Sequence, residues 1–252
     1  MSLDGRVALV TGGSRGIGRG IAIGLAEAGA DVAVNFANDE ESALETVERI
    51  HALGRRALAV KASIESADDD EAMVRTVESQ LGPISILINN AGVASRGRTV
   101  ADTKPEEISR ILGVHAIGAH HLCRLVIPGM RDLDRGDIVM ISSVTTKFNG
   151  ANGAPYNMGK AALEALAFTL AKEEARHGIH VNVVAPGIVD TEMGRRLVKA
   201  TTGAEDIHTL DATLPFGRVC QPEDVAAVVC FMVSDASRYV TGQRIYVDGG
   251  SQ

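Results

Sequence analysis

Seven short apolar runs recur along the chain. They are continuous rather than alternating, which is typical of strands buried on both faces of a parallel sheet. The predicted strands are Val7–Val10, Val32–Val34, Ala57–Val60, Ile84–Ile88, Ile138–Ile141, Val181–Ala185 and Ile245–Val247.

Helical patterns fill the intervals between these strands. The predicted helices are Ile17–Ala28, Glu40–Leu53, Asp69–Leu81, Glu106–Arg131, Ala161–His177 and Pro222–Val233. Strict alternation of strand and helix predicts an α/β fold, a doubly wound (Rossmann) parallel seven-stranded sheet with helices on both faces. The chain shows no linker, repeat or low-complexity stretch, so residues 1–252 are expected to form a single domain.

One long interval, from Pro186 to about Arg218, has no clear element. It is too long for an ordinary connection in a compact domain. Because it follows the sixth strand, it should lie above the carboxyl ends of the strands, where ligands bind in such sheets. We expect a substrate-binding loop at about 186–218.

Composition narrows the function classes. The net charge of −7 argues against nucleic acid or an anionic membrane as a partner. Cys123, Cys220 and Cys230 are odd in number and far apart, so neither a disulfide framework nor a zinc site is expected. The first residues are charged where a signal peptide would be apolar, and no uninterrupted apolar run reaches the roughly 18 residues of a membrane span. These features predict a cytoplasmic protein.

The first strand leads directly into Thr11-Gly12-Gly13-Ser14-Arg15-Gly16-Ile17-Gly18, and a helix follows. Glycines at such a turn allow a pyrophosphate to approach the backbone N–H groups of a helix N-terminus. The spacing G-x-x-x-G-x-G differs from the G-x-G-x-x-G fingerprint. A tight turn that binds nothing is the alternative.

The end of the second strand bears on which dinucleotide binds. NAD sites place an acidic residue there, whereas this strand ends Val34-Asn35-Phe36-Ala37-Asn38. Arg15 is positioned to reach a 2′-phosphate, although it is equally explained as a solvated loop arginine. The sequence therefore favours NADP(H), with NAD(H) possible.

Tyr156 and Lys160 are four residues apart, which places them on one face of a helix. A tyrosine pKa of about 10 is too high for acid–base work at neutral pH, and a nearby ammonium is expected to lower it. The pair is a candidate for proton exchange with an alcohol or carbonyl. A half-buried tyrosine beside a lysine that extends to solvent is the alternative.

Other strand ends carry polar or glycine motifs. They are Ser142-Ser143 after the fifth strand, Asn89-Asn90-Ala91-Gly92 after the fourth and Pro186-Gly187 after the sixth. Each alone is explained by a turn. Together they face one crevice, which predicts a bound ligand.

In these motifs the chain resembles the short-chain dehydrogenases/reductases, in particular their 3-oxoacyl-carrier-protein reductases. The motifs occur in family order over essentially the whole chain, and include Asn182–Thr191 and the tail Gly242–Gly250. The resemblance implies that Tyr156 is the general acid/base, that Lys160 lowers its pKa and binds the nicotinamide ribose, and that Ser143 holds the substrate oxygen. It also implies the cofactor-binding positions Gly12, Ser14, Arg15, Gly16, Ile17, Gly18, Asn35, Ser63, Ile64, Asn90, Ala91, Gly92, Tyr156, Lys160, Pro186, Gly187, Ile188 and Thr191.

Two positions depart from the family pattern. His115 replaces an asparagine of the proton relay, and Ser63 replaces an aspartate near the adenine. The family asparagine is thought to act largely through its backbone carbonyl, so His115 is expected at the relay position and tolerated there. An imidazole, with a pKa of about 6.5, is also expected to be able to add a pH dependence.

The predicted function is hydride transfer between NADP(H) and a ketone or secondary alcohol, with a 3-oxoacyl thioester or a bulky hydrophobic ketone favoured. The resemblance implies a homotetramer that pairs the helices at 106–131 and 154–177 across a two-fold axis. A non-catalytic nucleotide-binding sensor or scaffold and an NAD-dependent polyol or sugar dehydrogenase remain alternatives. Metal catalysis is not expected, because the seven histidines show no H-x-x-x-H spacing.

Overall fold

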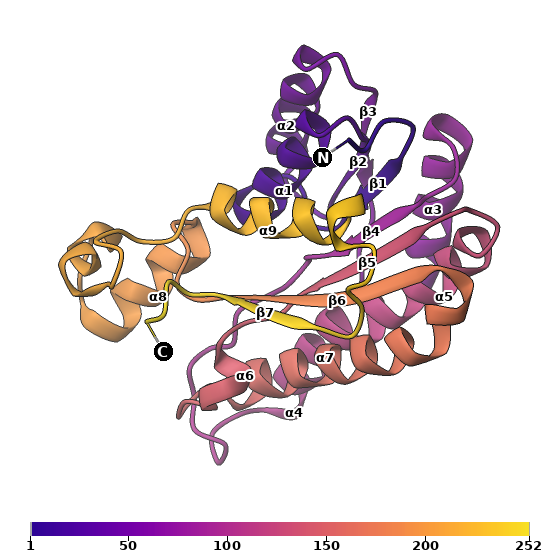
Figure 1. Cartoon of the computed structure of the whole chain (residues 1–252). Coiled ribbons are helices and arrows are strands. Elements are labelled where there is room, and N and C mark those ends of the chain that lie inside the picture. The colour runs from indigo at the N-terminus through magenta and orange to yellow at the C-terminus, as the bar shows by residue number, and fades with distance from the viewer. Residues whose placement is uncertain (1, 252) are drawn as a thin grey trace.

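The computed structural model describes residues 2–251. Met1 and Gln252, which the predicted domain of 1–252 includes, lie outside the described residues. All strand pairs are parallel, in the order β3-β2-β1-β4-β5-β6-β7 (Figure 1). The strands are β1 (Val7–Val10), β2 (Asp31–Phe36), β3 (Ala57–Lys61), β4 (Ile86–Asn89), β5 (Gly136–Ile141), β6 (Ile179–Pro186) and β7 (Arg244–Val247). The predicted doubly wound fold is confirmed.

Helices cover both faces of the sheet. The α-helices are α1 (Gly16–Glu27), α2 (Glu40–Ala52), α3 (Ala67–Leu81), α4 (Pro105–Leu112), α5 (Gly118–Met130), α6 (Thr145–Phe148), α7 (Ala154–Glu174), α8 (Glu192–Thr202) and α9 (Pro222–Met232). The shorter helical turns are η1 (Gly113–Ile117), η2 (Ala175–His177), η3 (Ile207–Thr213) and η4 (Asp235–Ser237).

Two apolar cores separate the layers. On one face α1, α2 and α9 pack through residues such as Ile21, Ile50 and Val229. On the other, α3, α5 and α7 pack through residues such as Val77 and Leu122. Figure 1 shows these two groups of helices on opposite sides of the sheet. The strands need apolar side chains on both faces for this reason, which explains their continuous apolar runs.

The expectation of no clear element between Pro186 and Arg218 is wrong. The segment contains α8 and η3. Helix α8 is short and mainly polar; its large apolar residues are Met193, Leu197 and Val198, and of these only Val198 is buried. Its beginning is nevertheless marked, because the Thr191 hydroxyl accepts a hydrogen bond from the Gly194 N–H.

Two predicted helices have different limits. The helix expected at Ala161–His177 begins at Ala154, with Pro155 in its first turn, where a missing N–H costs nothing. The helix expected at Glu106–Arg131 consists of α4, the π-helical turn η1 and α5, and α6 was not predicted at all. The other predicted elements differ by at most two residues at either end.

The continuous helical stretch Pro105–Met130 is long and apolar enough to cross a membrane by length and composition, since an 18-residue window within it has a mean hydropathy of 1.3. Its apolar side chains, among them Leu122, Val126 and Met130, belong to the core between α3, α7 and the sheet. Packing within this domain accounts for its apolar character.

Candidate active site

Four of the predicted motifs follow the carboxyl ends of β1, β4, β5 and β6, which are consecutive neighbours in the sheet. Strands β2 and β3 lie on one side of β1, and the strands from β4 onward lie on its other side. Open α/β sheets form their ligand crevice at such a switch point. The fold therefore brings the glycine turn after β1 next to the polar motifs of the other three strands.

Ser143, Tyr156 and Lys160 come together at the end of β5. The hydroxyls of Ser143 and Tyr156 are hydrogen-bonded. Lys160 Nζ donates a hydrogen bond of 2.7 Å to the carbonyl oxygen of Ile141, and lies 5.8 Å from the centre of the Tyr156 ring. Lys160 is only 4% exposed. Helix α7 thus presents both residues toward the serine turn.

The acid–base properties differ from the expectation that Lys160 lowers the Tyr156 pKa. Burial raises the pKa of the Tyr156 phenol, and the Ser143 hydrogen bond opposes this only in part. Burial also lowers the pKa of Lys160 to about 8, and the negative charge of Glu164 opposes part of this shift. The lysine directs its ammonium at a carbonyl of β5, so the phenol keeps its proton at neutral pH.

His115 lies beside this group, in the π-helical turn η1. Its Nε2 accepts a hydrogen bond of 2.9 Å from the Val93 N–H, and its ring meets the Tyr156 ring edge-on at 5.2 Å. It is 1% exposed. Burial, reinforced by the charge of Lys160, lowers the pKa of His115 to about 3. The imidazole is therefore neutral at physiological pH, and the expected pH dependence near neutrality does not arise.

The glycine turn fits the phosphates of a dinucleotide. Helix α1 begins at Gly16 without a side-chain cap and without an acidic residue in its first turn, so its N-terminal N–H groups suit an anion. Gly12 and Gly16 adopt positive φ angles of 59° and 53°. A Cβ atom on Gly18 would lie 2.2 Å from the carbonyl oxygen of Gly12. No larger residue fits at that position.

Asn35 and Asn90 hold this turn in place. Asn35 Oδ1 accepts a hydrogen bond of 3.1 Å from the Gly12 N–H, while its amide nitrogen donates to carbonyls at the end of β3. Asn90 Nδ2 donates to the carbonyls of Thr11 (2.8 Å) and Gly12 (3.1 Å). In turn, Thr11 Oγ1 accepts from the Asn90 and Ala91 N–H groups. Their amide nitrogens are committed to the protein backbone.

Arg15 extends from the glycine turn into solvent. Its Nη1 lies 2.8 Å from Glu192 of α8 and 3.9 Å from Asp39, and its side chain is 61% exposed. Both ion pairs are exposed and therefore contribute little to stability.

The remaining predicted cofactor positions lie around the same crevice. The Ser63 N–H donates to Asp69 Oδ2, and Ile64 is buried after β3. The Gly187 N–H donates to the carbonyl of Val247, and Ile188 packs against a small cluster that includes Val198. Ser14 is buried, Gly92 approaches Lys160, and Thr191 caps α8.

Sequence reasoning missed Glu164. It lies one helical turn after Lys160, is 5% exposed, and accepts a hydrogen bond of 2.6 Å from the Ser142 hydroxyl. The i, i+4 spacing from Lys160 was the available signal.

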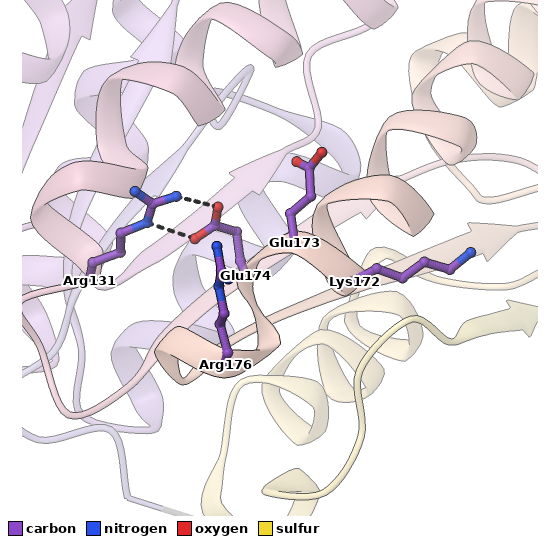
Figure 2. A pocket seen from close by; sticks show the side chains of 5 residues that line it. All are labelled: Arg131, Lys172, Glu173, Glu174 and Arg176. Atoms are coloured by element: carbon purple, nitrogen blue, oxygen red, sulfur yellow. Dashed lines mark hydrogen bonds and ion pairs between the residues drawn. The ribbon is translucent and has the colours of Figure 1, made fainter.

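A hollow of about 470 Å³ lies elsewhere on the molecule. Figure 2 shows its lining of charged side chains, with Arg131 forming two hydrogen bonds to Glu174. Glu174 ends α7, whereas Tyr156 is in its first turns, so the two are separated by roughly 27 Å along the helix. This hollow is not part of the site.

Comparison with known proteins gives consistent matches. The family model described as "Enoyl-(Acyl carrier protein) reductase" matches residues 12–252. The chain is 37% identical over 243 residues to the 3-oxoacyl-[acyl-carrier-protein] reductase FabG of Staphylococcus aureus, covering 96% of both chains. It is 34% identical to an L-rhamnose 1-dehydrogenase (NAD(P)(+)) of Sphingomonas, covering 98% of this chain and 96% of the relative.

A solved structure agrees with these relatives. A 7α-hydroxysteroid dehydrogenase complexed with NADH and 7-oxo glycochenodeoxycholic acid is 32% identical, with a TM-score of 0.90. The alignment covers 99% of this chain and 95% of that one.

We predict that His115→Asn retains turnover within about threefold of the unsubstituted protein, because a neutral imidazole supplies no proton near pH 7. The acidic limbs of the two pH–rate profiles should coincide. Loss of activity in His115→Asn would instead assign proton transfer to the imidazole.

The same substitution should change the pH dependence of stability. In the unfolded chain a histidine takes up a proton below about pH 6.5, whereas folded His115 does so only near pH 3. Its contribution to the free energy of unfolding therefore falls as the pH drops below 6.5. The free energy of unfolding, measured with urea at pH 7.5 and at pH 5, should therefore decrease less in His115→Asn than in the unsubstituted protein.

Proposed function

Because the chain belongs to the short-chain dehydrogenase/reductase family, we propose that it transfers a hydride between NADP(H) and a ketone or its secondary alcohol. Its relatives include the 3-oxoacyl-[acyl-carrier-protein] reductase and the L-rhamnose 1-dehydrogenase named above, and this chain is likewise an oxidoreductase acting on CH–OH or carbonyl groups. The observation that carries the finer proposal is the Ser143–Tyr156 hydrogen bond with buried Lys160 one turn along α7.

The chain's own residues supply the proton and the orientation. The cofactor, when bound, supplies or accepts the hydride. Ser143 donates a hydrogen bond to the substrate oxygen, and Tyr156 transfers its phenolic proton to that oxygen during reduction. A phenol whose pKa is raised by burial is protonated at neutral pH and suits the donor role. The ammonium of Lys160, 5.8 Å from the centre of the Tyr156 ring, supplies a positive charge near the phenolate that remains.

The substrate class follows from exposed apolar side chains on segments that follow the strand ends. They are Val100, Phe148, Met158, Met193, Leu197 and Phe216. Helix α8 also carries three cations in exposed ion pairs, Arg195 with Asp190, Arg196 with Glu192 and Lys199 with Glu205. Apolar recognition of a bulky ketone or of the acyl part of a 3-oxoacyl thioester is therefore favoured over a sugar, which needs many polar partners.

A cytoplasmic location is part of this proposal. Cys123, Cys220 and Cys230 are all free thiols, which suits a reducing compartment.

We predict NADPH-dependent reduction of acetoacetyl-CoA or a bulky cyclic ketone, and a loss of kcat by at least about a hundredfold in Tyr156→Phe, the size expected for removing a general acid. NADPH consumption across thioesters, steroid ketones and sugars is the measurement. Tyr239→Phe is the matched control, since Tyr239 is fully exposed. Near-normal turnover by Tyr156→Phe would refute the mechanism. NADPH binding without turnover of any of these compounds would favour a nucleotide sensor.

Preference for NADP(H) is expected to depend on Arg15. Replacing it with glutamine should lower kcat/KM for NADPH about tenfold or more, since a charge-assisted bond to phosphate is lost, and leave kcat/KM for NADH nearly unchanged. Arg49→Gln, which removes another exposed, ion-paired arginine, serves as the control. A wild-type preference for NADH would contradict the proposal.

We propose a homotetramer. Ile117 is 53% exposed, and with Ala116, His120 and Leu166 it lines a shallow hollow of about 340 Å³ on the outer side of η1, α5 and α7. An apolar surface on these helices suits pairing across a two-fold axis. Light scattering at micromolar concentration should give a tetramer, and Ile117→Glu should reduce the mass. Leu44→Glu on α2 is the control. A monomeric wild-type protein would contradict the proposal.

A further inference from the structure

The carboxylate of Glu164 is nearly sealed from solvent, between the serine turn and the last strand. It lies on α7, and its side chain is 7% exposed. Lys160 is one turn earlier on the same helix face. A buried carboxylate must be hydrogen-bonded or paired to be tolerated. Its partners therefore show what it holds.

One oxygen of Glu164 contacts the side chains of Ser142 and Thr146, which lie on either side of Ser143 in the sequence. Oε1 accepts a hydrogen bond of 2.6 Å from the Ser142 hydroxyl and lies 2.9 Å from Thr146 Oγ1. Thr146 Oγ1 is also 2.9 Å from the carbonyl oxygen of Ser143. Ser142 precedes Ser143 and Thr146 follows it in α6. The backbone on both sides of Ser143 is thus tied to a single carboxylate.

The other oxygen connects this turn to the last strand. Glu164 Oε2 accepts a hydrogen bond of 2.6 Å from Nη1 of Arg244 in β7. The Arg244 guanidinium in turn lies over the Tyr246 ring, 4.9 Å from its centre. Charge-assisted hydrogen bonds of this kind are shorter and stronger than neutral ones. The carboxylate is therefore fixed at both oxygens.

Glu164 also acts on Lys160 through its charge. Tyr156, His115 and Glu164 are the titratable groups near the Lys160 ammonium, and of these Glu164 is the anion. Its negative charge opposes the effect of burial on the Lys160 pKa. A residue that only stabilised the fold would not need this placement.

We propose that Glu164 is a positioning residue of the active site, which holds Ser143 against Tyr156 through Ser142 and Thr146 and keeps a negative charge beside Lys160. This rests on the proposed function of Ser143, Tyr156 and Lys160. Arg244 is the partner that fixes Glu164 in place. The last strand thereby takes part in organising the site.

Glu164→Gln tests the proposal, with Glu173→Gln as the matched control, because Glu173 is an exposed carboxylate on the same helix. Kinetics use NADPH and acetoacetyl-CoA, or the ketone that is turned over. We expect kcat to fall about tenfold when a neutral acceptor replaces the charged one, with KM for NADPH unchanged within about twofold. Unaltered kcat would overturn the proposal.

A second measurement does not depend on turnover. In the protein with ¹³Cε-labelled lysine, the Lys160 resonance should titrate at lower pH in Glu164→Gln than in the wild type, and Glu173→Gln should leave it unchanged. An unchanged Lys160 titration contradicts the role of Glu164. If the wild type reduces no ketone, the proposed function fails, while this titration still decides whether Glu164 acts on Lys160.

The double variant Glu164→Gln/Arg244→Gln separates positioning from folding. Arg244→Gln alone leaves a buried carboxylate without its cation and should lower the midpoint of urea unfolding. The double variant should regain stability, because two amides can pair, yet keep the low kcat of Glu164→Gln. Recovery of kcat together with stability would mean that Glu164 is merely structural.

Discussion

The buried ammonium of Lys160 constrains the whole site. An ammonium that is only 4% exposed requires a strong acceptor, and the carbonyl oxygen of Ile141 at 2.7 Å provides it. Ile141 is the last residue of β5, so this bond fixes α7 against the end of that strand. Ser142 and Ser143 follow immediately, and Tyr156 is one turn before the lysine. This hydrogen bond therefore helps to set the distance between Ser143 and Tyr156.

Around the glycine turn, polar side chains hold the backbone in place, while backbone N–H groups remain available for a ligand. Asn35 and Asn90 are expected from the sequence to bind the cofactor, yet their described side-chain hydrogen bonds go to backbone groups of the turn and of neighbouring strands. The backbone N–H groups at the start of α1 remain uncapped. These side chains hold the turn in its conformation, and that conformation leaves the backbone N–H groups at the start of α1 available to bind phosphates.

Much of the fold was predictable because its physics is local. Strands buried on both faces must be continuously apolar, and the edge strands β3 and β7, although only partly buried, also carry short apolar runs. Helix α8 was not predicted because it is short and mainly polar, and it buries only Val198. The motif residues Ser143, Tyr156 and Lys160 were placed by spacing and resemblance. Glu164 was missed because its partners Ser142 and Arg244 are distant in sequence, and only the folded chain brings them together.

The histidine at position 115 illustrates how a departure from a family pattern is accommodated. An imidazole is bulkier than an asparagine side chain, so neighbouring residues must leave room. A Cβ atom on Gly159 would lie 3.1 Å from His115 Nδ1, and one on Gly92 would lie 3.3 Å from Nε2. Glycine at both positions allows the ring to fit between the β4 loop and α7, close against Tyr156.

The same crowding determines the chemistry of that ring. With Lys160 nearby and water excluded, a second positive charge is strongly disfavoured, so the imidazole remains neutral and accepts the Val93 N–H. A titratable residue placed at the centre of an acid–base site is thus prevented from titrating by the packing that admits it. The glycines at 92 and 159 and the histidine at 115 form one steric unit, and a change at any of the three alters the space available to Tyr156.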